Sequence, residues 1–139
     1  MTSPFVGEFA GTLVLVLLGD GVVANVFLKR SKAEGAGWMV IATGWSFAVL
    51  CGILTAIAFG SSDAHINPAV TLALAITSGS FAKIVPYWSA QFLGAFTGAT
   101  LVGCIFCRIG RSPKTRTLSS AFSALRLRSG IIPATCFAK

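Results

Sequence analysis

Three long runs of apolar residues constrain the fold of this chain more than any other feature of its sequence. They cover residues 5–28, 38–59 and 81–106, and each reaches the ~20 residues that a helix needs to cross a bilayer core. The chain is 55% hydrophobic and only 11% charged, which is too apolar for an ordinary soluble domain. Because backbone polar groups find no water in lipid, such runs are expected to be helical. The sequence therefore predicts an all-α membrane protein with three transmembrane helices.

A fourth apolar run, about 68–77, is too short to cross the membrane at ~1.5 Å per residue. It follows a polar break and opens with Asn67 and Pro68, where Asn is a preferred N-cap and Pro suits the first helical position. A helix that starts inside the membrane brings unpaired N–H groups and partial positive charge to mid-depth. Irregular backbone is tolerated there only where it is buried or lines a wet cavity. We therefore predict a re-entrant half-helix, preceded by a segment whose carbonyl groups face a polar pathway.

The residues at this break resemble the first signature motif of the aquaporin and glycerol-facilitator family. Residues 64–71 read AHINPAVT, and the flanking stretches 7–9 (GEF) and 91–95 (QFLGA) are also similar to the family. The resemblance covers residues 1–102 and implies one of two inverted repeats, each with three spanning helices and one half-helix. It implies a passive channel for glycerol, related small neutral solutes or water. By the same resemblance the chain is not an enzyme and uses no cofactor.

The resemblance also implies which residues line the pore. The amide of Asn67 would donate hydrogen bonds to the oxygen of a passing water or alcohol, and carbonyl groups before it would accept the hydroxyl hydrogens. The half-helix dipole would oppose the passage of protons and cations. Two plainer interpretations stay open, because Asn-Pro is also a common turn dipeptide and His65 could simply be a satisfied buried imidazole. The expected pore-lining residues are Ala64, His65, Ile66, Asn67, Pro68, Ala69 and, from the second helix, Trp45.

Other residues of the spanning helices carry separate expectations. Glu8 is an acid inside a membrane helix, which is costly and marks a functional or structural position. By the resemblance Glu8 braces the loop before the half-helix, with Gln91 in a supporting role; an interfacial acid near the N-terminus is the alternative. Trp45 resembles the tryptophan that gives glycerol-type pores an apolar wall, although an ordinary lipid-facing tryptophan is the alternative. Asp20 departs from the family pattern and receives no role.

The charge distribution separates the end of the chain from the rest. Residues 1–106 hold four basic and four acidic residues, whereas seven basic residues and no acid follow, which accounts for the net charge of +7. Cys104 and Cys107 resemble a zinc or redox pair, but no second pair follows them. Aromatic residues are scarce and no nucleic-acid-binding motif occurs, so no nucleic-acid partner is expected. We predict an irregular basic tail at 103–139, outside the family fold and without a metal.

This tail carries neither a second Asn-Pro-Ala-like motif nor the filter arginine that the resemblance implies for a complete channel. Our hypothesis is a one-base loss near codon 103, because codons can be chosen so that one inserted T turns residues 102–110 into VWLYFLPHW, similar to the end of the third helix in glycerol facilitators. Sequencing the encoding DNA tests this hypothesis, which fails if no single insertion restores an open frame with a second motif.

We therefore expect a truncated, non-conducting half-channel that spans the inner (plasma) membrane several times. Its expected partners are the lipid bilayer, small neutral solutes such as glycerol and water, and further copies of itself, since complete family members are tetramers. Two alternatives remain. Two copies could pair to rebuild a pore, or the basic tail could make the chain a membrane-anchored protein that binds anionic lipid or nucleic acid.

The orientation of the chain in the membrane is a testable case of two conflicting rules. Family topology puts residues 29–37 and the tail outside, whereas the positive-inside rule puts both in the cytoplasm. Because seven uncompensated positive charges follow the third helix, we predict mixed or inverted insertion. Cysteine-accessibility labelling of the tail in intact cells measures this, and uniformly external labelling would contradict it.

Overall fold

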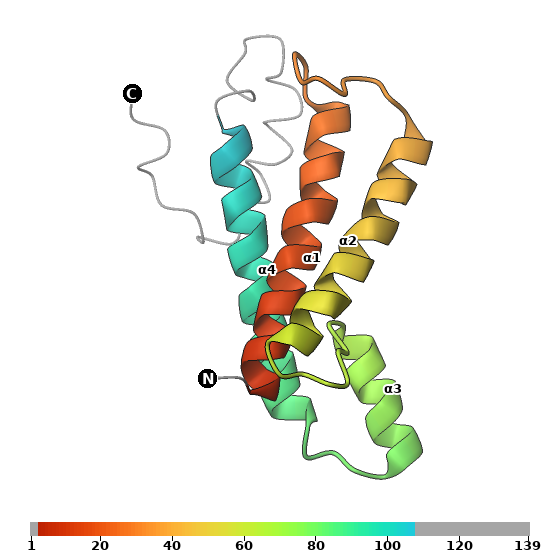
Figure 1. Cartoon of the computed structure of the whole chain (residues 1–139), viewed down its shortest axis with the longest axis vertical. Helices are drawn as coiled ribbons and strands as arrows, with labels where there is room; N and C mark the ends of the chain where they lie inside the picture. The colour runs from red at the N-terminus through yellow and green to blue at the C-terminus, as the bar shows by residue number, and fades with distance from the viewer. Residues whose placement is uncertain (1–2, 108–139) are drawn as a thin grey trace, which may run out of the picture.

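The computed structural model describes residues 3–107, which form a helical bundle with no strand in that part of the chain (Figure 1). Three helices are long and apolar enough to cross a membrane, and the fourth is a shorter apolar helix. The predicted fold class is therefore confirmed for these residues, whereas the predictions for the basic tail beyond residue 107 lie outside them. In chain order the helices are α1 (Pro4–Phe27), α2 (Trp38–Ala58), α3 (Pro68–Ser78) and α4 (Ile84–Phe106).

The helix boundaries follow from local backbone chemistry. Both α1 and α3 begin with a polar N-cap followed by proline: Ser3 accepts a hydrogen bond from the Val6 amide at 3.3 Å, and Asn67 caps α3 in the same manner. α3 ends at Gly79, whose φ of 68° is the left-handed conformation that glycine adopts readily. The last spanning helix was expected from residue 81, but it begins at Ile84 because residues 81–83 form a turn closed by the Ile84 amide on the Phe81 carbonyl.

α1 is the central helix of the bundle, with α2 on one side and α4 on the other (Figure 1). Glycines on both sides of α1 let the backbones approach closely, as small residues do in membrane helices. A Cβ atom on Gly11 would lie 2.7 Å from the Gly52 carbonyl oxygen of α2. A Cβ atom on Gly98 of α4 would lie 2.7 Å from the Leu13 carbonyl oxygen. The short helix α3 lies at the end of the bundle where α2 ends and α4 begins, and it packs against α4.

The bundle buries a group of polar side chains alongside apolar ones, and its outside is apolar. Large apolar side chains lie on the exterior, with Met39 79% and Val85 76% exposed, as expected where the surrounding solvent is lipid. A polar group buried in this way is tolerated only with hydrogen-bond partners. The fold therefore concentrates its polar contacts in one place. The largest fully buried side chains are Gln91, Glu8, Thr71 and Ser61.

The close contact between α1 and α4 gives a first prediction. Gly98→Ala places a methyl group against the α1 backbone, so we expect it to lower the unfolding free energy by ~1–3 kcal/mol, the usual cost of overpacking. Gly103→Ala in the same helix meets no atom within 4 Å and is the matched control, with no loss of stability expected. Thermal unfolding of the detergent-purified chain, followed by circular dichroism, compares the two. Equal midpoints for both variants would show that the contact is unimportant.

Candidate functional site

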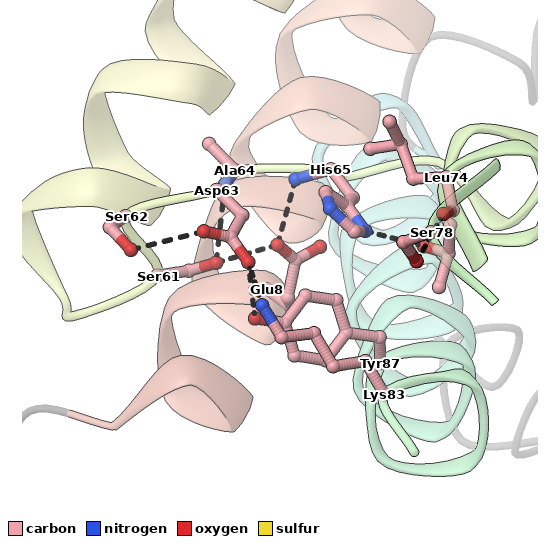
Figure 2. A network of polar contacts seen from close by, with 11 residues as sticks. Glu8, Ser61, Ser62, Asp63, Ala64, His65, Leu74, Ser78, Lys83 and Tyr87 are labelled. Atoms are coloured by element: carbon pink, nitrogen blue, oxygen red, sulfur yellow. Dashed lines mark hydrogen bonds and ion pairs between the residues drawn. The ribbon is translucent and has the colours of Figure 1, made fainter. Parts of the chain in front are cut away.

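The centre of the site is the carboxylate of Glu8, which extends from α1 toward the loop between α2 and α3 (Figure 2). Its Oε1 accepts hydrogen bonds from the Ser61 hydroxyl at 2.7 Å and the His65 amide at 2.8 Å. Its Oε2 accepts from the Ile66 amide at 2.7 Å and from Gln91 Nε2 on α4 at 2.8 Å. The side chain is fully buried. An ionised carboxylate offers about four lone-pair sites, and each of them here has a donor.

These hydrogen bonds determine which way the neighbouring carbonyl groups point. In a planar trans peptide unit the N–H and the C=O are directed oppositely, and no cis peptide occurs among the described residues. The amides of His65 and Ile66 both point at Glu8. The carbonyl groups of the same two peptide units, those of Ala64 and His65, therefore point away from Glu8.

The backbone of this segment is strained, and Glu8 maintains it. Ala64 and Ile66 have φ values of 43° and 42°, in the left-handed region that residues with a side chain rarely adopt. Such a conformation costs ~1–3 kcal/mol per residue and persists only where the surroundings hold it. The charge-assisted bonds to Glu8 are the interactions that supply this restraint. The carboxylate thus stabilises a segment that would otherwise relax.

Asn67 presents the donor of the site. Its Oδ1 accepts a hydrogen bond from the Ala69 amide at 2.9 Å, as an N-cap does. The Nδ2 branch of the same amide is therefore directed away from the helix, and Nδ2 has no partner within residues 3–107. Asn67 and Ala69 are both exposed. The first turn of α3 adds the partial positive charge of a helix N-terminus at this point.

A second set of contacts joins this helix end to α4. The Thr71 hydroxyl donates its one proton to the Asn67 carbonyl at 3.1 Å. It accepts from Gln91 Nε2 at 3.1 Å and lies 3.1 Å from His65 Nδ1. These contacts join the loop before α3, the first turn of α3 and α4 through one hydroxyl group. Trp88 Nε1 adds a hydrogen bond to the Pro68 carbonyl at 3.0 Å.

The structure therefore brings most of the residues singled out from the sequence into one region, but not Trp45. Trp45 precedes the end of α2 at Ala58 by 13 residues, which is ~20 Å along a helix axis. Its ring packs on Gly19 of α1, where a Cβ atom would meet a ring carbon at 2.5 Å. The members that gather around the loop are Glu8, Ala64, His65, Ile66, Asn67, Pro68, Ala69 and Gln91.

Several contacting residues were not singled out from the sequence. Thr71 could have been found, because a threonine four residues after a helix N-cap is placed to bond back to that residue's carbonyl. Ser61 lies in a break that composition identifies only as polar, and Trp88 resembles any other aromatic residue of a membrane helix. Their partners lie on other segments, so no local pattern identifies them.

The Glu8 network gives a second prediction. Glu8→Gln replaces an acceptor oxygen with an amide group that is itself a donor, so at least one of the four donors loses its acceptor. An unpaired buried donor costs ~1–3 kcal/mol, so hydrogen exchange at the His65 and Ile66 amides should accelerate about tenfold or more. Glu34→Gln is the control, since among the described residues that carboxylate accepts a hydrogen bond only from the exposed Arg30 amide. Unchanged exchange in Glu8→Gln would exclude the restraining role.

Comparison with known proteins identifies relatives of this chain. It is 50% identical over 101 residues to a probable glycerol uptake facilitator protein of Thermotoga maritima, covering 72% of this chain and 42% of that protein. It is 46% identical over 103 residues to a glycerol uptake facilitator protein of Streptococcus pneumoniae, covering 73% and 43%. The glycerol facilitator-aquaporin gla of Lactococcus lactis subsp. cremoris is 43% identical over 107 residues, covering 76% and 36%. The chain thus spans about two fifths of the length of these relatives.

No solved structure matches the chain. The family described as major intrinsic protein matches residues 1–132. This match continues past residue 102, where the family-like part was expected to end, into residues that the structure does not describe. The family resemblance of residues 64–71 is thereby confirmed. With nearly the whole chain matched and a buried Glu8 holding the loop before a short capped helix, this protein belongs to the major intrinsic protein family.

Proposed function

We propose that residues 3–107 form one half of the wall of a passive channel for glycerol, related small neutral solutes and water. The observation that carries the proposal is the restraint by Glu8, which turns the Ala64 and His65 carbonyl groups away from itself. A solute hydroxyl is both a donor and an acceptor. Carbonyl oxygens would accept a hydrogen bond from the hydroxyl group, and Asn67 Nδ2 would donate one to its oxygen. No chemical step is involved.

The same geometry supports selection against ions. The N-terminal end of α3 carries partial positive charge, which disfavours cations and protons at the narrow part of such a path. Trp45 would offer an apolar surface to the carbon backbone of a polyol. Since Trp45 lies far along α2 from the loop, it would act at a separate point of the path. Pro68 and Ala69 would line the path beside Asn67.

We further propose that this half does not conduct by itself. Asn67 is exposed, and α3 packs against α4 while its apolar side chains Leu74 and Ile76 remain 47% and 63% exposed. A wall on one side leaves carbonyl groups facing lipid, which costs several kcal/mol per unpaired group, about the penalty for polar groups in hydrocarbon. A second, oppositely oriented half would complete the wall. The site of action would be the plasma membrane, and assembly into oligomers is part of this proposal.

The test of non-conduction uses the 139-residue chain. Reconstituted into liposomes, it should pass neither water nor glycerol faster than the empty vesicles, as measured by stopped-flow light scattering under a glycerol gradient. Swelling above that background which Asn67→Leu abolishes would show that one repeat suffices, by pairing of copies or otherwise.

A chimera tests the channel role itself. Residues 1–107 joined to the second half of the Thermotoga maritima relative should conduct glycerol. In this chimera Asn67→Leu should reduce the flux about tenfold or more, because it removes the donor and the cap together. Trp45→Ala should lower the preference for glycerol over water. Leu101→Ala, on the outer face of α4, serves as the control and should leave the flux unchanged. A folded chimera whose glycerol flux is the same with Asn67→Leu would refute the proposed path.

A further inference from the structure

A second polar cluster lies beside the Glu8 network, and none of its members belongs to the site residues expected from the sequence. The Lys83 ammonium forms an ion pair with Asp63 Oδ2 (Figure 2). The Tyr87 hydroxyl donates to the same oxygen at 3.4 Å, and the Ser62 hydroxyl donates to Oδ1 at 3.2 Å. The Lys83 nitrogen lies 5.7 Å from the centre of the Tyr87 ring, within range of a cation–π interaction.

This cluster lies beside Glu8 and touches the same restrained segment (Figure 2). Asp63 directly precedes Ala64, and Glu8 holds the amides of His65 and Ile66. Tyr87 is 4% exposed, and its ring meets the His65 imidazole edge-on at a centroid distance of 5.0 Å. The short strained segment is therefore held from α1 by hydrogen bonds and from α4 by an ion pair and a ring contact.

The ion pair also closes a long piece of chain. Asp63 and Lys83 are 20 residues apart, and all of α3 lies between them. α3 is the least packed helix of the bundle, because α4 is its main contact. Within residues 3–107 its other polar contacts to neighbouring segments, from His65, Trp88 and Gln91, reach only the first turn. The ion pair joins the two ends of the segment 63–83 and so reduces the conformational freedom of the chain between them.

We propose that the ion pair between Asp63 and Lys83, which lies against Tyr87, acts as a charge-dependent latch. This latch positions the Ala64 and His65 carbonyl groups and holds α3 against α4. Asp63 and Lys83 are both positioning residues, since neither lies on the proposed solute path. The side chains are 33% and 57% exposed, so salt and protons reach the pair. The latch rests on the proposed function in one respect only, which is the role of the Ala64 and His65 carbonyl groups in the solute path.

The electrostatics of the pair agree with the latch. The hydrogen bond from Lys83 lowers the pKa of Asp63, and the same contact raises the pKa of Lys83. Because the pKa of Asp63 is lowered, the stabilisation by the ion pair is fully present above the ordinary pKa of an aspartic acid. This stabilisation is lost as the pH falls through the lowered pKa of Asp63. The raised pKa means that it is lost again as the pH rises through that of Lys83. The groups facing the pair are Glu8, His65 and Tyr87.

Four variants of the 139-residue chain test the latch. Asp63→Asn and Lys83→Met should each accelerate hydrogen exchange of residues 61–67 about three- to fivefold, as expected for one exposed ion pair, and the effect should shrink at high salt. Exchanging the charges, Asp63→Lys with Lys83→Asp, should return the rate to within about twofold of the original. Lys32→Met, at an exposed lysine of another loop, is the control and should change nothing.

A pH series distinguishes an ion pair from a contact that stabilises by packing alone, because only the stabilisation by the ion pair changes with pH. The difference in thermal midpoint between the unchanged chain and Asp63→Asn should be largest near neutral pH and vanish in acid. Unchanged exchange in both single variants overturns the latch, and so does a charge exchange that leaves the loop as loose as the single variants. These measurements do not depend on solute flux. They can therefore support the latch while the chimera fails to conduct glycerol, or refute the latch while the chimera conducts it.

Discussion

The hydrogen bonds of the Glu8 carboxylate are the interaction on which the rest of this structure depends. A carboxylate only accepts, and its two oxygens can serve donors that arrive from several directions. Here they gather a hydroxyl and two amides from one loop and an amide side chain from α4. One buried group thus connects three segments and holds two residues at positive φ. Without it the loop would lose its restraint and the proposed path its carbonyl groups.

This arrangement depends on close helix packing, which small residues provide. The backbones on both sides of α1 come close enough that a methyl group on Gly11 or Gly98 would collide with a carbonyl oxygen. Larger residues there would separate the helices and move Gln91 away from Glu8. Lipid supplies no hydrophobic force between the helices, so such packing and the buried hydrogen bonds share the task of holding the bundle together. Packing and polar network are therefore one structural unit.

The short helix α3 has two functions at its start and few attachments elsewhere. Asn67 ends the irregular loop by capping the helix, and the same geometry leaves its Nδ2 pointing outward. The first turn is tied to α4 through Thr71 and Trp88. Farther along, the helix is exposed on its apolar side. Because α3 is attached mainly at its first turn, we expect the ion pair between Asp63 and Lys83 to affect how firmly the helix is held.

The sequence by itself determined the helices and most of their boundaries, although α4 begins at Ile84 and not at residue 81. Apolar runs of spanning length must become helices in lipid, and Asn67 with Pro68 must start one, because each effect is local along the chain. Family resemblance pointed to Glu8 and Gln91 but not to their geometry. Only the tertiary structure decided that α1 lies in the centre, that Lys83 meets Asp63, and that the Trp45 ring covers Gly19. Those contacts join residues far apart in the chain, and their partners depend on how the helices pack, which no local pattern specifies.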